Sequence, residues 1–130
     1  METVGEYRVV NSLGEGGMAE VYLAVPNDSL DMSKSVAIKV MAPWLRDRPE
    51  FVERFEREIK VCSGLAHPGI VETLDWGWKG ERLYMVMEHI PGQLLSEKLP
   101  ELTGDWSRLR ETLSQLMQAV DYAHQQGVAH

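Results

Sequence analysis

The sequence predicts an α+β fold, in which an antiparallel sheet of about five strands and one covering helix are followed by further helices. Three observations support this class. Short runs that alternate apolar and polar residues dominate residues 7–90, one amphipathic helical pattern interrupts them, and a second helical pattern fills residues 105–126. We expect two parts, the sheet in residues 1–90 and the final helices in residues 91–130.

The strands are predicted in chain order from their alternation. YRVVNSL and AEVYLAV are two strands joined by a glycine-rich turn, and VAIKVM is a third strand with Ala37 and Lys39 on one face. IVETLDW and RLYMVMEHI are the last two strands, joined around Lys79 and Gly80. A Pro-Gly pair then ends the sheet pattern.

Apolar periodicity predicts the helices. The first runs from Pro49 to a cap near Gly64, and its apolar stripe consists of Phe51, Phe55, Ile59 and Cys62. A short helix is expected over residues 94–99, followed by the loop PELTGDW and a long helix that Asp105 caps. The stripe of that last helix consists of Leu109, Leu113, Leu116, Val120 and Ala123.

Composition narrows the classes of function. A net charge of -7 argues against nonspecific nucleic-acid binding. No run approaches the roughly 18 apolar residues that a membrane span needs, and the amino terminus lacks the pattern of a secretory signal. Cys62 has no disulfide partner in the chain, which fits a reducing compartment. We expect a cytoplasmic location, with no nucleic-acid partner, no membrane segment and no residue assigned to a metal.

The stretch LGEGGMAEVYLAV places three glycines between two strands. Glycines allow a backbone to approach a phosphate closely. A Walker loop would need Gly-Lys-Ser/Thr after the glycines, and a dinucleotide-binding turn would open a helix, whereas Met18 follows here and a strand comes next. Two interpretations remain, a hairpin that folds over a nucleotide and a merely flexible turn.

Lys39 is the second candidate for nucleotide binding. A lysine in an apolar strand is more often a solvent-facing residue, and a binding role would require a carboxylate partner. Relative to Phe55, a step of about 100° per residue places Glu58 about 60° away and Glu56 about 100° away. Glu58 borders the buried stripe and Glu56 faces water. A solvated charge paired with a neighbouring arginine is the other interpretation of Glu58.

These segments stand in an order that resembles the protein kinase family: GEGGMAEV from Gly14, VAIK ending at Lys39, Glu58, and MVME ending at Glu88. HPGIV and the ending YAHQQGVAH are similar to the bacterial, eukaryotic-like serine/threonine kinases. The resemblance covers nearly all of residues 5–130. It implies a kinase amino-terminal lobe with one regulatory helix, followed by the first helices of an incomplete carboxy-terminal lobe.

The resemblance also implies roles for individual residues. Lys39 would contact the α- and β-phosphates of ATP and Glu58 would hold it in an ion pair. Met87 would be the gatekeeper beside the adenine. The residues expected to bind the nucleotide are Leu13, Gly14, Gly16, Gly17, Val21, Ala37, Lys39, Met87, Glu88 and Ile90. Ala19 stands where the family has its third glycine.

The sequence stops at His130, where the family's catalytic loop begins. The catalytic Asp and the Asn and Asp that hold Mg²⁺ lie beyond that point in the family, so these 130 residues alone should not transfer phosphate. Two classes of function remain. The chain is the ATP-binding portion of a kinase that phosphorylates protein hydroxyls, or it is a non-catalytic, kinase-like binding module. In either case the stripe of the last helix must pack on its own sheet, pair with a second chain, or remain partly exposed and prone to aggregate.

Overall fold

The computed structural model describes residues 3–128, which form two compact units. The first contains the residues up to Gly64 together with Glu72–His89. The second contains Leu65–Val71 and the residues from Ile90 onward. The chain therefore leaves the first unit at the end of its long helix, returns for two strands, and leaves it again.

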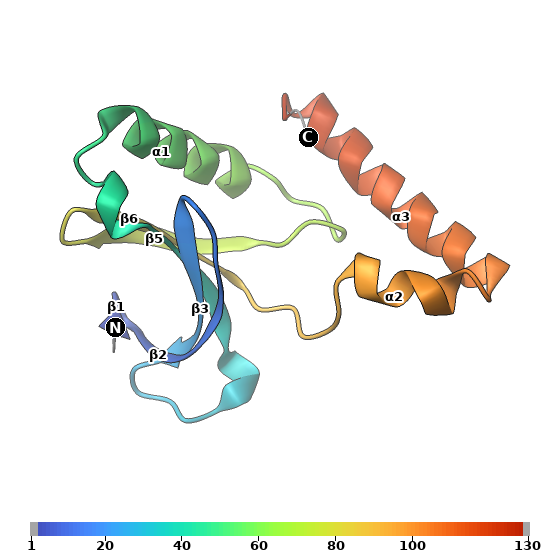
Figure 1. The fold of residues 1–130 in the computed structure, drawn as a ribbon, viewed down its shortest axis with the longest axis horizontal. Coiled ribbons are helices and arrows are strands. Elements are labelled where there is room, and N and C mark those ends of the chain that lie inside the picture. Colours follow the sequence, from blue (N-terminus) through green and yellow to red (C-terminus); the bar gives the residue numbers. More distant parts are fainter. Residues whose placement is uncertain (1–2, 129–130) are drawn as a thin grey trace. The chain divides into compact units, whose positions relative to one another are not determined.

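An antiparallel sheet with the strand order β1-β2-β3-β4-β6-β5 forms the first unit (Figure 1). Its strands are β1 (Thr3–Val4), β2 (Tyr7–Glu15), β3 (Ala19–Pro26), β4 (Val36–Met41), β5 (Thr73–Lys79) and β6 (Arg82–Glu88). Short 3₁₀ helices occupy Met32–Lys34 and Pro43–Leu45. The sheet exceeds the expected five strands by β1, which is too short for an alternating pattern to reveal it.

The strand expected at residues 70–76 begins later, at Thr73. Ile70 and Val71 match a strand by composition, but the Ile70 amide donates to the His67 carbonyl at 3.0 Å and closes a turn. The strand instead continues through Trp76 and Trp78 to Lys79. Tertiary pairing with β6 therefore decides this boundary, because propensity is a weak guide to strand ends.

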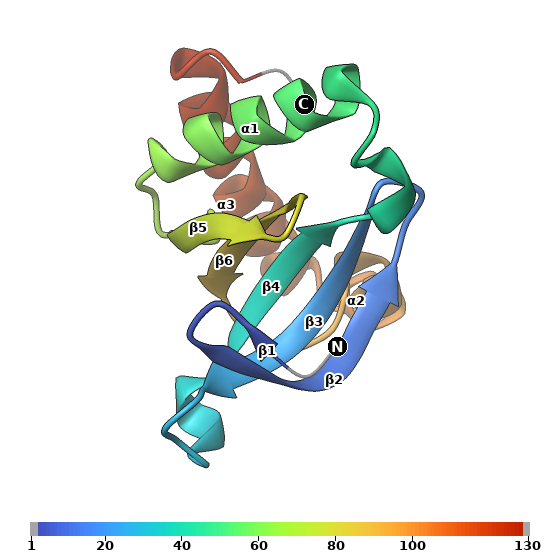
Figure 2. The same cartoon turned by 90° about the vertical axis from the view of Figure 1, so that its left-hand side faces the viewer.

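Each face of the sheet carries its own apolar cluster. On one face Met41, Leu83 and Met85 pack with Phe55 and Ile59 of helix α1 (Pro49–Ser63). The opposite face is covered by the curled β1–β2 end of the same sheet (Figure 2). Residues buried on that second face are Val4, Ala24, Val36, Ile38, Val40, Tyr84 and Val86. Most of β4 is thus buried on this second face, whereas Ala37 and Lys39 on its other face are half-buried.

Helix α1 matches its predicted start and apolar stripe. Pro49 occupies its first turn, and the Gly64 amide donates to the Val61 carbonyl at 3.1 Å at its end. Phe55 and Ile59 are buried, while Phe51 and Cys62 are half-buried and pack against the same cluster. The helix presents one face to the sheet and leaves its charged residues at the border and outside.

A hollow of about 380 Å³ lies between α1 and the edge strand β5. Trp76 and Trp78 alternate along β5 on the face that α1 covers, and each is about half exposed at 52% and 49%. Ile59 and Lys60 of α1 line the other side of the hollow.

Two helices, α2 (Leu95–Leu102) and α3 (Trp106–Gln125), belong to the second unit. α2 extends past the expected end at residue 99 and contains Pro100, which cannot donate to the carbonyl one turn earlier. Burial of Leu102, only 4% exposed, accounts for the longer helix. Asp105 caps α3 as predicted, because its carboxylate accepts a hydrogen bond of 3.2 Å from the Arg108 amide.

The segment Leu65–Val71 packs against α3 within the second unit. The Ala66 amide donates to the Tyr122 hydroxyl at 2.9 Å, and the rings of His67 and Tyr122 lie 5.2 Å apart. Much of the rest of α3 is open to solvent, including Leu113 and Leu116. Across residues 3–128, no helix combines the length and the apolar character that crossing a bilayer requires.

Candidate nucleotide-binding site

The glycine-rich stretch forms the tip of the β2–β3 hairpin. The Gly16 amide donates to the Ala19 carbonyl at 2.8 Å and closes the turn. Gly14 pairs with Val21 across the hairpin, and the Ala42 amide, just after β4, donates to the Met18 carbonyl at 2.9 Å. The turn connects two strands and opens no helix, which excludes a dinucleotide-binding turn and is common to the two remaining interpretations of the glycines.

The chain itself gives no steric reason for two of these glycines. A Cβ atom on Gly14 or Gly17 would meet nothing within 4 Å, and neither residue has a positive φ. Gly80, in contrast, has a φ of 61°, which its turn between β5 and β6 requires. The open space over the hairpin tip fits a ligand whose phosphates approach the backbone amides.

Four predicted residues share one face of the sheet. Cross-strand register pairs Val21 with Lys39, and Ala37 with Met87. Directly opposed residues in antiparallel strands point to the same side, and residues two apart along a strand do as well. Val21, Ala37, Lys39 and Met87 therefore form a patch on the side that α1 covers in part, and all four are half-buried.

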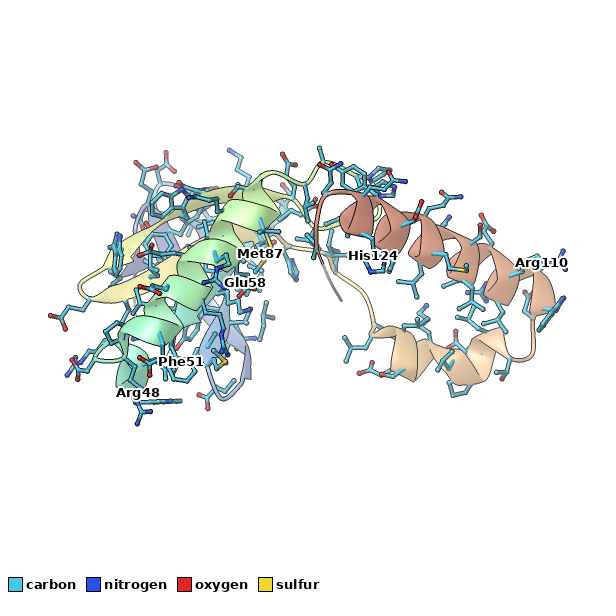
Figure 3. The ribbon with its side chains drawn as sticks, turned by 90° about the horizontal axis from the view of Figure 1, so that it is seen from above. Arg48, Phe51, Glu58, Met87, Arg110 and His124 are labelled. Atoms are coloured by element: carbon cyan, nitrogen blue, oxygen red, sulfur yellow. The ribbon has the colours of Figure 1, made fainter. Side chains whose placement is uncertain are left out.

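Lys39 and Glu58 form the ion pair that helical geometry favoured. The Lys39 Nζ atom donates to Glu58 Oε1 at 2.8 Å and lies 5.9 Å from the centre of the Phe55 ring. Glu58 projects from the face of α1 beside the sheet, as Figure 3 shows. Glu56, two residues earlier, is exposed. A lysine ammonium that a carboxylate holds beside a largely apolar patch can bind a phosphate as a point charge.

Cys62 lies one helical turn beyond Glu58. Burial raises the pKa of its thiol, the Glu58 carboxylate raises it further, and Lys39 acts in the opposite direction. A raised pKa keeps the thiol protonated, so Cys62 is a packing residue and a poor nucleophile.

Leu13, Glu88 and Ile90 are the other residues expected to bind the nucleotide. Leu13 is exposed at the end of the glycine-rich strand. The Glu88 amide donates to the Glu72 carbonyl at 3.0 Å, and the Glu88 carboxylate accepts from the Glu72 amide at 2.9 Å. Ile90 is the first residue of the second unit and is exposed. The Glu88 amide is therefore already bonded within the chain.

The structure also contains a polar cluster that sequence reasoning missed. Arg82 of β6 contacts Glu20 of β3, with Nη2 and Oε2 3.2 Å apart. Its Nε atom donates to the Met41 carbonyl at 2.8 Å, and the Tyr22 hydroxyl donates to the same Glu20 oxygen. Glu20 and Arg82 stand 62 positions apart, so no local pattern could have connected them.

Comparisons with known proteins agree with this geometry. The protein kinase domain family matches residues 7–130. Serine/threonine-protein kinase PknJ of Mycobacterium tuberculosis is 39% identical over 124 residues, which cover 95% of this chain and 20% of PknJ. Serine/threonine-protein kinase PrkC of Bacillus subtilis is 34% identical over 129 residues, which cover 97% of this chain and 19% of PrkC.

The fold matches a solved structure of the same kind. The crystal structure of the Mycobacterium tuberculosis PknI kinase domain superimposes with a TM-score of 0.72 at 30% identity, covering 98% of this chain and 52% of that one. The chain thus spans about half of a kinase domain and about a fifth of the curated relatives. The sequence and the fold together show that this chain belongs to the protein kinase domain family, as an amino-terminal portion of the bacterial, eukaryotic-like serine/threonine type.

Proposed function

We propose that these residues are the ATP-binding portion of a serine/threonine protein kinase, which in its complete form transfers the γ-phosphoryl group of ATP to protein hydroxyls. One observation carries this proposal. The Lys39–Glu58 ion pair of 2.8 Å lies on the sheet face that also presents Val21, Ala37 and Met87, beside a glycine hairpin with open space at its tip.

The chain's own residues would divide the nucleotide between them. Backbone amides of the hairpin tip and the Lys39 ammonium would bind the phosphates, with Glu58 keeping Lys39 in position. Apolar side chains would cover the adenine, and the Glu88 carbonyl and the Ile90 backbone would bond its edge. The covering side chains are Leu13, Val21, Ala37 and Met87.

Magnesium belongs to the complete kinase in this proposal. Among residues 3–128, no group of three or more His, Cys, Asp or Glu side chains is placed to hold a metal ion. The family's metal-holding Asn and Asp and its catalytic Asp lie beyond His130. A polypeptide of these 130 residues would therefore bind ATP in the millimolar range or weaker and would transfer no phosphate.

Two measurements on the product of the native gene test the proposal. Its intact mass and peptides show whether sequence continues past His130, and transfer of labelled γ-phosphate to a protein acceptor shows the activity. Lys39→Met should abolish the transfer, whereas Lys34→Met, at an exposed position outside the patch, should leave it unchanged. A product that extends past His130 but transfers nothing to any protein acceptor would contradict the proposal.

The exposed face of α3 favours a second candidate, a non-catalytic binding or regulatory module. Leu113, Leu116 and Met117 are 42%, 46% and 70% exposed, so this helix offers apolar surface to a second copy or to another protein. A native product that ends at His130 and sediments as a dimer would favour this candidate over the kinase. The proposed cytoplasmic location applies to both candidates and rests on the composition of the chain.

A further inference from the structure

Arg82 joins two strands at the point where the glycine hairpin meets the sheet. Glu20, its partner at 3.2 Å, is the second residue of β3 and follows the turn directly. The Met41 carbonyl, its other partner at 2.8 Å, ends β4 opposite Ala19. One guanidinium group therefore holds both strands that support the base of the hairpin.

The cluster faces away from the candidate nucleotide. Successive residues of a strand point to opposite faces, so Glu20 and Tyr22 lie on the side opposite Val21. Arg82 likewise lies opposite Leu83, which packs on the α1 side. Arg82 cannot touch a ligand on the Lys39 face, and any effect on that ligand must pass through the backbone of the hairpin.

The contacts of Arg82 are of the stronger kind. The side chains of Arg82 and Glu20 are each only 17% exposed, so water screens their attraction less than it would at the surface. Bonds between ionised groups are stronger than neutral ones, and a guanidinium presents several donors in a fixed plane. The Tyr22 hydroxyl adds a further bond to Glu20, which restrains the carboxylate in one orientation.

The tip of the hairpin lacks such restraints. Gly14 and Gly17 have no atoms within 4 Å of the positions of their missing Cβ atoms. Outside the strand ladder, the backbone hydrogen bonds found at the turn among the described residues are those of Gly16 to Ala19 and of Ala42 to Met18. A flexible tip can place its amides against phosphates reproducibly only if its base is fixed.

We propose that Arg82 is a positioning residue for the glycine hairpin, which holds Glu20 and the Met41 carbonyl so that the hairpin amides meet the phosphates of the nucleotide. The inference rests on the proposed nucleotide-binding function. The inference predicts which part of the nucleotide depends on Arg82. Arg82 supports the grip on the phosphates and leaves the adenine contacts unaffected.

The test compares the binding of two ligands to the product of the native gene. Calorimetry gives the Kd for ATP with magnesium and the Kd for adenosine, which has no phosphates. Arg82→Met keeps an apolar stem of similar length and removes the donors. It should raise the Kd for ATP about tenfold, as the loss of a charged hydrogen bond does, and leave the Kd for adenosine within about twofold.

Two further variants control the result. Arg8→Met also removes an arginine bonded to a backbone carbonyl, that of Ser29 at 3.2 Å, at the other end of the hairpin strands, and it should change neither Kd. Arg82→Lys keeps the charge without the fork of donors and should give an intermediate Kd for ATP. If Arg82→Met fails to fold, Arg82→Lys decides, and a wild-type Kd for ATP in that variant would overturn the inference.

Each remaining outcome has one meaning. An equal loss of ATP and adenosine binding in Arg82→Met would make Arg82 a general structural residue and overturn the inference. Unchanged ATP binding in Arg82→Met would overturn it too, and the proposed function would stand. A wild-type protein that binds neither ligand would overturn both.

Discussion

Replacement of Glu58 by Gln should damage function far more than stability. The Lys39–Glu58 pair is short at 2.8 Å, but the two side chains remain 29% and 40% exposed. Water screens a pair of this kind, so its loss should lower the free energy of unfolding by only about 0.5 kcal/mol. Without its partner Lys39 would leave its position, and a displacement of about 1 Å can cost a reaction about a hundredfold in rate.

The two effects can be compared on one scale. A hundredfold loss of rate corresponds to about 2.7 kcal/mol, several times the expected loss of stability. We would measure phosphate transfer by the product of the native gene and unfold the same samples in urea. Glu56→Gln is the matched control, because Glu56 lies on the same helix, is exposed, and makes no ion pair among the described residues.

Two results would refute this reasoning. Phosphate transfer by Glu58→Gln within about threefold of wild type would mean that the ion pair does not position Lys39 for the reaction. A fall in stability as large as the fall in activity would mean that the loss of activity reflects unfolding. Equal effects of the Glu56 and Glu58 substitutions would also contradict the assignment.

Four further predictions concern packing, pH, capping and the adenine surface. Gly77→Ala would place a Cβ 2.6 Å from the Tyr84 hydroxyl oxygen and should cost about 1–3 kcal/mol of stability in urea unfolding, partly restored by Tyr84→Phe. The hydrogen bond to Glu20, and then burial, raise the pKa of Tyr22 to about 12 from 10.0. The contribution of Tyr22 to the free energy of unfolding is therefore complete below pH 10 and falls between pH 10 and 12. The stability difference between wild type and Tyr22→Phe should therefore be smaller at pH 11 than at pH 9. Asp105→Ala removes the cap of α3 and should cost about 1 kcal/mol, measured by thermal unfolding. Ala37→Leu should fill the adenine surface and weaken ATP binding in calorimetry by about tenfold or more.

Each of these predictions can fail on its own. Gly80→Ala is the control for Gly77→Ala, since its cost comes from a φ of 61° and Tyr84→Phe should not restore it. A stability difference between wild type and Tyr22→Phe that stays constant from pH 9 to 11 would contradict the predicted loss of stability at alkaline pH. Asp105→Asn should keep most of the stability that the cap of α3 contributes. Unchanged ATP binding in Ala37→Leu would place the adenine elsewhere.

Elements with a strong period were predictable from sequence. The stripe of α1 favoured Glu58 over Glu56 as a partner of Lys39, because 3.6 residues per turn leave Glu58 and not Glu56 beside the buried face, and the ion pair confirms this ranking. The alternation of VAIKVM likewise predicted which residues share a face of the strand with Lys39. The other face of that strand is the one buried against β1 and β2. Local periodicity carries this information, and tertiary packing agrees with it.

Features set by distant partners were not predictable. The start of β5 depends on pairing with β6, and the extension of α2 through Pro100 depends on burying Leu102. The Arg82–Glu20 contact crosses 62 positions and matches no family motif that the sequence displays. For β5 and for Arg82 the deciding contact comes from a residue outside the window in which a pattern can be read, and for α2 it comes from the packing that buries Leu102.

Trp76 and Trp78 can report the position of α1 through their fluorescence. The chain has four tryptophans, and these two line the hollow beside α1 while each remains about half exposed. Any displacement of α1 along β5 would change the polarity around their indole rings and shift their emission. With Trp44 and Trp106 replaced by Phe, the tryptophan emission of these 130 residues would come from this pair alone. The position of the helix that carries Glu58 could then be followed in solution without an attached dye.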